Sequence, residues 1–227
     1  MSKLMTSSQT LAYGLWIISL PLIAAPAADV SFSAQVTSMG TSPDGGSMTM
    51  TGKLWVSHGM IRRESLDEGH VMVVLNDPAH KKSLHLVPDQ GFYEDVSALS
   101  GTRGGFYTDD LIPGGPADVL VHDLKNPCAN EPGVHCKRIG PDSVNGRPCE
   151  KWQLASAAGK PWTECIDQGL GAIIEQDRNG RLFTLTEIRE GPQEASLFLL
   201  PADMKLVVLQ PNSYQMDYET LHPEAPK

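Results

Sequence analysis

Apolar and polar residues alternate along much of the N-terminal half of the chain, beyond an apolar run at its start. Alternation with a period of two is typical of half-buried β-strands. Short clusters of Gly, Pro and Asp interrupt it, which favours antiparallel strands joined by turns. The runs that we expect to form strands here are residues 30–39, 47–57, 60–66, 70–77, 83–87 and 91–96.

The same pattern returns in the C-terminal third. Asn145-Gly146 and Asn179-Gly180 are dipeptides that favour tight two-residue turns, and His58-Gly59 indicates another turn. The chain is therefore predicted to be mostly β. The runs that we expect to form strands in this part are residues 140–156, 160–167, 172–177, 181–190 and 204–210.

The middle of the chain, residues 101–132, is rich in Gly, Pro and Asp instead. Within it, residues 116–126 favour a short helix, because Pro116 suits a first helical turn and Val119, Leu120 and Leu124 would share a face. Loops this long are usually functional or disordered. The segment is therefore a candidate lid or contact element, and the pattern leaves that choice open.

The N-terminus resembles a secretory signal. Lys3 precedes an apolar run at residues 11–25, and small residues follow up to Ala28. The run is shorter than the about 20 apolar residues of a membrane span, although retention as an anchor is the alternative. We expect residues 1–28 to be cleaved, residues 29–210 to form a single domain and residues 211–227 to be a flexible tail. The mature protein would then be periplasmic, soluble and not an integral membrane protein.

The charge balance is acidic. The chain has 18 Lys and Arg against 27 Asp and Glu, a formal net charge of -9, and loss of Lys3 with the signal makes it -10. An acidic protein repels phosphate backbones, so no nucleic-acid partner is expected. No run of Lys or Arg suggests docking on anionic lipid.

The four cysteines suit an exported chain with two disulfides, for which three pairings are possible. We favour Cys128–Cys136 and Cys149–Cys165, because each closes a local loop. The hairpin around the second pair has one tryptophan on each strand.

If Leu154 lies opposite Lys160, then Cys149 lies opposite Cys165, and the two tryptophans, at positions 152 and 162, also lie opposite each other. The cysteine and tryptophan pairs would project from opposite faces of the hairpin. Both pairs favour a structural staple rather than a site.

Catalytic and metal-binding motifs are missing from the sequence. His58, His70, His80 and His85 fall in one strand region, and Met48, Met50, Met60 and Met72 lie nearby, which could suggest copper. The histidines lack the spacing of metal ligands, and alternating Met residues in strands are more often core residues. There is no GxSxG elbow, no SxxK motif and no CxxC redox pair. We therefore expect no metal, no cofactor and no enzymatic activity.

Three stretches resemble the periplasmic lipoprotein-carrier superfamily, the LolA/LolB-like fold, in an exported branch of it. They are GKLWVSHGMIRRE with the strands after it, VNGRPCEKWQL with PWTECIDQGLGAIIEQD, and EASLFLLPADMKLV. The resemblance implies an α+β fold in which a strongly curved antiparallel sheet forms an incomplete barrel, with a few short helices covering one side. It also implies an apolar cavity for acyl chains. Arg62 and Arg63 are the candidates for the arginine that carriers have in this cavity.

Our leading hypothesis is an exported periplasmic binding protein with an apolar groove for a lipid or an acylated cargo, such as the acyl chains of a lipoprotein. The alternatives are an envelope protein-protein interaction or sensor module that uses the same curved sheet, and a hydrolase whose triad is not visible in the sequence. The residues expected to line the groove are Trp55, Met60, Arg62, Met72, Val74, Leu84, Leu86 and Phe183.

Overall fold

The computed structural model describes residues 30–41, 45–67, 69–97, 119–129, 132–157 and 159–207, and its strands form one 12-stranded sheet. Nearly all expected strands are present, with their ends shifted by a few residues. The strands are β1 (Phe32–Thr41), β2 (Ser47–Ser57), β3 (Met60–Asp67), β4 (His70–Asp77), β5 (Lys82–Val87), β6 (Phe92–Asp95), β7 (Val134–Val144), β8 (Arg147–Ser156), β9 (Trp162–Asp167), β10 (Ala172–Arg178), β11 (Arg181–Glu190) and β12 (Lys205–Leu206). The described helices are short 3₁₀ turns: η2 (Pro78–His80), η3 (Pro88–Gln90) and η4 (Ala195–Phe198).

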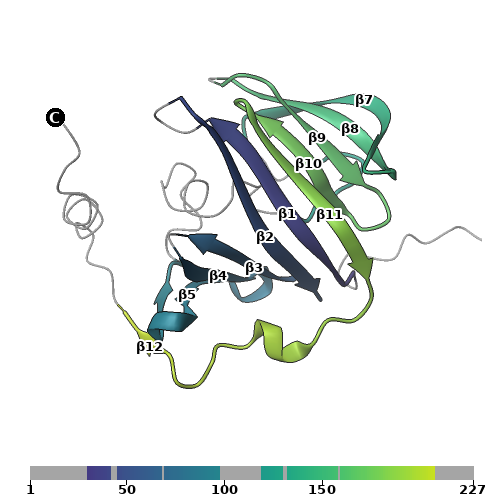
Figure 1. Cartoon of the computed structure of the whole chain (residues 1–227). Coiled ribbons are helices and arrows are strands. Elements are labelled where there is room, and N and C mark those ends of the chain that lie inside the picture. The colour runs from purple at the N-terminus through teal and green to yellow at the C-terminus, as the bar shows by residue number, and fades with distance from the viewer. Residues whose placement is uncertain are drawn as a thin grey trace, which may run out of the picture.

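The strand order in the sheet is β12-β6-β5-β4-β3-β2-β1-β11-β10-β9-β8-β7. Neighbouring strands are antiparallel, except that β12 runs parallel to β6. Figure 1 shows β1 and β2 crossing the middle of the molecule, with β3–β5 turned away below them and β7–β10 on the other side. The sheet ends at β12 and β7 and does not close on itself. The predicted fold class is therefore confirmed as a mostly β, strongly curved and open antiparallel sheet, whose few helices are 3₁₀ turns.

The tight turns lie where the sequence predicts them. His58, Asn145 and Asn179 have φ angles of 49°, 51° and 57°, and the glycine after each also has a positive φ. Two successive residues in the left-handed region match the right-handed twist of a hairpin. These three turns fix the registers of β2 with β3, β7 with β8 and β10 with β11.

One face of the sheet carries the main core, and we call it the inner face. Phe32, Leu54, Ile61 and Phe183 lie on it, from strands β1, β2, β3 and β11, and each is at most 3% exposed. They belong to one cluster that also takes residues from β8, β9 and β10. Strands as far apart in the sheet as β3 and β8 contribute to this cluster because the sheet curves around it.

The opposite face, here called the outer face, is covered over β3–β6 by a C-terminal strap, residues 191–207. Figure 1 shows this strap running below the sheet from the end of β11 to β12. Arg62 Nη1 donates a hydrogen bond of 2.9 Å to the Leu197 carbonyl, and the Lys205 N–H donates one of 3.0 Å to the Gly91 carbonyl. The cluster beneath the strap consists of Val73, Leu75, Leu84 and Leu86, with Tyr93, Leu200 and Met204 packed against it.

The helix expected over residues 116–126 is wrong in the part that the structure describes, residues 119–126. Leu120 forms an antiparallel bridge with Ala172, and the Ile173 N–H donates to the Val119 carbonyl at 2.9 Å. The segment is extended because pairing with the start of β10 satisfies its backbone and buries Val119 completely. Residues 101–118 and 130–131 of the candidate lid lie outside the described residues, as do the signal at residues 1–28 and the tail at residues 211–227.

Both predicted disulfides are present. The Cα atoms of Cys128 and Cys136 are 5.8 Å apart, and those of Cys149 and Cys165 are 5.5 Å apart. The first disulfide ties the segment that follows residue 119 to the edge strand β7. The second joins β8 to β9 inside the inner-face cluster.

The hairpin register that we expected is wrong by two residues. Lys151 lies opposite Cys165, and Glu164 lies opposite Trp152, so the Cys149–Cys165 disulfide joins diagonal neighbours. A shift of two residues leaves each side chain on its original face. The cysteine pair and the two tryptophans accordingly pack in different clusters.

No helix in the described ranges is long and apolar enough to cross a membrane.

Candidate functional site

The eight residues predicted to line an apolar groove do not share one surface. Met72, Val74 and Phe183 lie on the inner face, where they pair with Ser65, Arg63 and Ser38 on neighbouring strands. The other five lie on the outer face: Trp55, Met60, Arg62, Leu84 and Leu86.

The outer-face residues fix the strap. Leu84 and Leu86 are 5% and 1% exposed, in the cluster that the strap covers. Arg62 forms an ion pair with Glu64, and its guanidinium carbon lies 5.9 Å from the centroid of the Trp55 ring. Together with the bond to the strap backbone, these contacts make Arg62 an anchor on the outer face rather than a cavity residue.

Arg63 is the arginine that β3 places on the inner face. It lies between Leu54 on β2 and Val74 on β4 and is 8% exposed. A guanidinium carries five N–H donors, so it can bind several oxygen atoms at once. A cavity of about 10 Å³ lies beside it, lined by Val36, Gly52, Lys53, Leu54, Arg63, Glu64 and Phe183. Of the two arginines that the resemblance left open, only Arg63 faces the apolar core.

Three buried polar atoms have no hydrogen-bond partner in the described part of the chain: Ser65 Oγ, His85 Nε2 and Trp152 Nε1. Ser65 and His85 are each 6% exposed and lie on the inner face. Burial lowers the pKa of His85 below its ordinary value of 6.5, so the ring is neutral at pH 7. An unpaired buried polar atom costs about 1–3 kcal/mol, which makes these positions exceptional in a native core.

The sequence pattern did not indicate Ser65, and it indicated His85 only as a possible metal ligand. The alternation along β3 could have indicated both residues. Arg63 and Ser65 lie two and four positions after Ile61, an apolar core residue, and therefore share its face of the strand. A polar residue at a position that the alternation assigns to the core is a candidate site residue, because core positions are normally apolar. No group of three His, Cys, Asp or Glu side chains within the described ranges is arranged to hold a metal ion.

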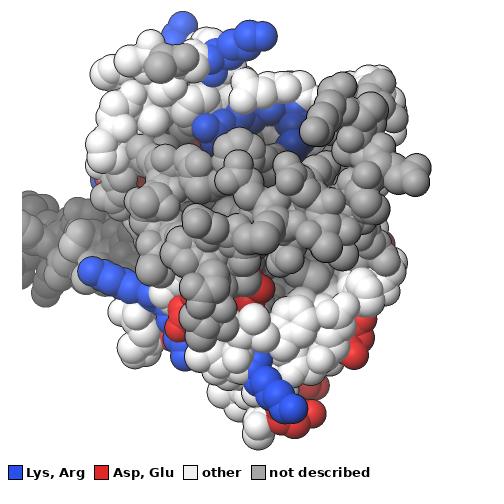
Figure 2. Space-filling model, turned by 90° about the vertical axis from the view of Figure 1, so that its left-hand side faces the viewer, with Lys and Arg blue, Asp and Glu red and all other residues white. Residues whose placement is uncertain are grey.

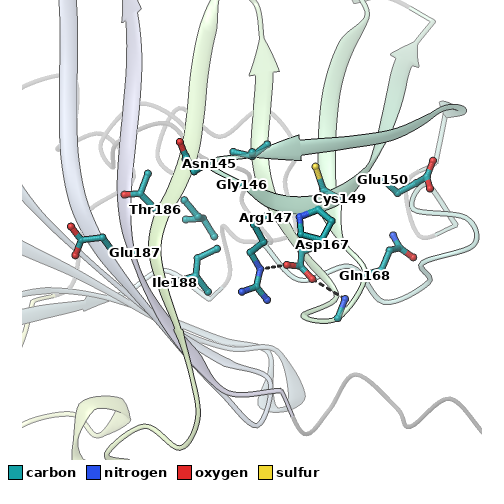
Figure 3. Close-up of a pocket in the computed structure, with 14 residues that line it drawn as sticks. Asn145, Gly146, Arg147, Cys149, Glu150, Asp167, Gln168, Thr186, Glu187 and Ile188 are labelled. Carbon is teal, nitrogen blue, oxygen red and sulfur yellow. Dashed lines mark hydrogen bonds and ion pairs between the residues drawn. The ribbon is translucent and has the colours of Figure 1, made fainter.

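A second hollow, of about 800 Å³, opens between the β7–β8 turn, the end of β9 and the lower half of β11. Figure 3 shows Arg147 pointing into it toward Asp167. Its lining consists of residues 144–150, 167–169 and 185–188.

The charged groups in this hollow are engaged with one another. Arg147 donates to the carboxylates of Asp167 and Glu190, the latter at 2.5 Å. Burial opposes the charge on Arg147, but these two bonds raise its pKa. Asp167 Oδ1 also accepts from the N–H of Gly169 at 2.8 Å, which closes the turn after β9. The network therefore stabilises the end of β9, and nothing in it indicates a particular ligand.

The surface carries charges of both signs. Figure 2 shows Lys and Arg in separate groups toward the top and bottom of one side, with Asp and Glu gathered in the lower part. The described part of this side is thus of mixed charge.

No protein-family model matches the chain, and a comparison with curated proteins found no match. Several solved structures are similar to it. An uncharacterized conserved protein from Thermus thermophilus has a TM-score of 0.49 and 11% identity, covering 81% of this chain and 93% of that chain. MucB, in its complex with MucA from Pseudomonas aeruginosa, has a TM-score of 0.44 and 15% identity, covering 81% of this chain and 60% of that chain.

A LolA superfamily protein from Nitrosomonas europaea has a TM-score of 0.32 and 9% identity, covering 76% of this chain and 91% of that chain. The similar solved structures thus include a member of the superfamily that the sequence resembles.

Proposed function

We propose that this chain is an exported, non-enzymatic binding protein that holds the acyl part of a lipid or of an acylated protein against its inner face. The observation that carries the proposal is the position of Arg63, a buried arginine in an apolar wall formed by Leu54, Val74 and Phe183. Such a wall suits an acyl chain, and the guanidinium suits the oxygen atoms at its polar end.

Apolar burial alone supplies enough free energy for this role. Each buried CH₂ contributes about 0.8 kcal/mol, so a chain of twelve contributes about 10 kcal/mol before the cost of ordering it. No reacting group is needed for such binding. The cavity beside Arg63 has room for about one water molecule, so we expect the inner face to widen when an acyl chain enters.

Export is supported by the two disulfides, which persist in oxidising compartments such as the bacterial periplasm. The signal expected at residues 1–28 adds to this proposal from the sequence side.

Native mass spectrometry of the protein purified from its own compartment tests the proposal. We expect a bound mass that organic solvent releases and that proves to be a lipid or an acylated peptide. Arg63→Met should lower the bound fraction about tenfold, because a charged hydrogen-bond donor is lost.

Arg62→Met is the matched control, since Arg62 is the neighbouring arginine but faces the strap. It should leave the bound fraction unchanged. A bare polypeptide mass for the wild-type protein would contradict the proposal and favour the alternative of a protein-docking module.

A further inference from the structure

The two ends of the sheet differ in how well they are protected against pairing with another chain. At one end, β7 carries the exposed side chains of Lys137 and Arg138. Its ladder with β8 is interrupted between Arg138 and Gly140, and Pro141 follows. Charged side chains, bulges and prolines all hinder an edge strand from pairing with a further strand. The β7 edge is therefore a poor docking surface.

Strand β12 ends the sheet on the other side, as far as the described residues go. It is short and Lys205 is charged, but neither a bulge nor a proline interrupts residues 205–207. Leu206 and Val207 are 52% and 41% exposed, although both are large and apolar. The sequence continues with two further apolar residues. An exposed apolar run at a sheet edge is a candidate for pairing with another strand.

The apolar cluster beneath the strap is open at this edge. The residues that form one row across the outer face, on β4, β5, β6 and β12, are Val73, Leu86, Tyr93 and Leu206. Val73 and Leu86 are buried, whereas Leu206 is half exposed because no described strand follows it. A further apolar side chain beside Leu206 would continue the row and cover it.

The backbone of β12 leaves Leu206 unpaired on the open side. The Lys205 N–H donates to the Gly91 carbonyl at 3.0 Å, and the Val207 N–H donates to the Tyr93 carbonyl at 2.9 Å. Alternate residues of a strand direct their N–H and C=O groups to opposite neighbours, so those of Leu206 point away from β6. Leu206 thus offers one donor and one acceptor next to an exposed apolar side chain.

We propose that two copies of this chain pair through β12, antiparallel about a twofold axis, with Leu206 of one copy opposite Leu206 of the other. Each Leu206 N–H would donate to the carbonyl of the other copy, so the pair uses both outward groups. The two side chains would cover each other and join the apolar rows of both copies. This surface is separate from the inner face, so the inference goes beyond the proposed function.

A second copy is the partner that this edge fits, because the arrangement is self-complementary. Lys205 lies on the other side of the strand from Leu206 and would face Val207 of the partner copy, so no like charges are directly opposed. Because the β7 edge is hindered, pairing stops at two copies instead of continuing into a fibre.

The dimer should be weak. A standard stable interface buries about 1,600 Å², and two short strands bury less. Each copy is also acidic, with a formal net charge of -9 for the whole chain, so the copies repel each other at long range. We therefore expect a dissociation constant of about 10–100 μM, measured by sedimentation equilibrium of the full mature protein.

Two substitutions at one position test the strand pairing. Leu206→Lys would put like charges opposite each other on the axis, and Leu206→Pro removes the N–H that faces the open edge but not the bonds to β6. Each should raise the dissociation constant about tenfold or more. Ile139→Lys, at an exposed apolar residue of β7, is the matched control and should dimerise like the wild type. Circular dichroism would show that all three variants are folded.

Cysteine crosslinking tests the register. Opposite residues in a hydrogen-bonded antiparallel pair have Cα atoms about 5.5 Å apart, which a disulfide can span. The two copies of residue 207 would be about 8 Å apart, which is too far. Diamide, which oxidises two thiols to a disulfide, should therefore convert Leu206→Cys to a covalent dimer and leave Val207→Cys mainly uncrosslinked.

Three results would overturn the inference. They are a wild-type protein that stays monomeric at millimolar concentration, a dimer that survives both Leu206→Lys and Leu206→Pro or is lost in Ile139→Lys, and crosslinking of Val207→Cys in preference to Leu206→Cys. None of these results bears on the proposed binding of an acyl chain, which the bound mass and the Arg63→Met variant test separately.

Discussion

Removing the Cys149–Cys165 disulfide should destabilise the fold more than removing Cys128–Cys136. The first crosslink spans a sequence separation of 16 residues and the second one of 8 residues. In the chain-entropy model, loops of these sizes stabilise by about 3.1 and about 2.5 kcal/mol at 25 °C. Loop length alone thus gives a small difference.

Burial increases this difference. Cys149 and Cys165 are 6% and 1% exposed, whereas Cys128 is buried at 8% and Cys136 is only half-buried. If each buried sulfur leaves a methyl-sized cavity that costs about 1 kcal/mol, the double alanine variants lose about 5 and about 3.5 kcal/mol. For a domain of this size the melting temperature should fall by roughly 10–20 °C and 7–14 °C, respectively.

Urea unfolding followed by tryptophan fluorescence measures both losses, because Trp152 and Trp162 report on the hairpin that the inner disulfide crosslinks. Equal stabilities, or a less stable Cys128→Ala/Cys136→Ala variant, would refute the reasoning from loop length and burial. The folded fraction of the Cys149→Ala/Cys165→Ala variant should still retain cargo, because this disulfide joins β8 to β9, whereas the wall proposed for the acyl chain lies on β2, β3, β4 and β11.

Three further outcomes are expected. The free energy of unfolding should be constant above pH 6.5 and fall by up to about 1.4 kcal/mol per pH unit below it, because His85 becomes protonated in the unfolded chain while burial keeps it neutral in the folded protein. His85→Phe should reduce this slope, as measured by urea unfolding at several pH values. Gly52→Ala should lower the free energy of unfolding by about 1–3 kcal/mol, because the added Cβ would clash with the Glu64 carbonyl oxygen. Gly40→Ala is the control and should have the melting temperature of the wild type, because its Cβ would have no contact under 3.5 Å. Arg62→Met should raise hydrogen exchange in the strap about tenfold and leave the sheet protected; unchanged exchange there would show that Arg62 does not hold the strap.

The turns and the disulfides of this fold could be predicted because their signals are local. Asn145-Gly146 and Asn179-Gly180 need positive φ angles at adjacent residues, and short loops bring the paired cysteines together. The predicted register of β8 with β9 was wrong by two residues, because the sequence between these strands does not specify where their pairing begins. The helix expected around Val119 failed because pairing with the start of β10 outweighed the local pattern.

The candidate site was harder to predict because strands β4 and β5 are buried on both faces. Val73 and Val74 are adjacent in sequence, yet one packs under the strap and the other faces the core. Alternation separates the two faces but does not tell which of them is inner. That choice depends on the strap, which crosses the sheet from the far end of the chain. The sequence therefore indicated Leu86 as a groove residue, although the C-terminal strap covers it in the structure.

The central pairing of β1 with β11 has a consequence for the order in which the chain folds. Strands β1–β6 are paired in chain order, and so are β7–β11, but β1 and β11 meet only after the whole sequence between them is available. Non-local strand pairs form slowly, because closing the long intervening loop loses chain entropy before any contact forms. Until β11 emerges, β1 presents an unpaired edge with Phe32, Ala34 and Val36 on one side, which is a template for aggregation. The joining of these two strands is therefore where we expect folding to be slowest and misfolding to begin, and translocation from the N-terminus, if the chain is exported as we propose, would expose this edge for longest.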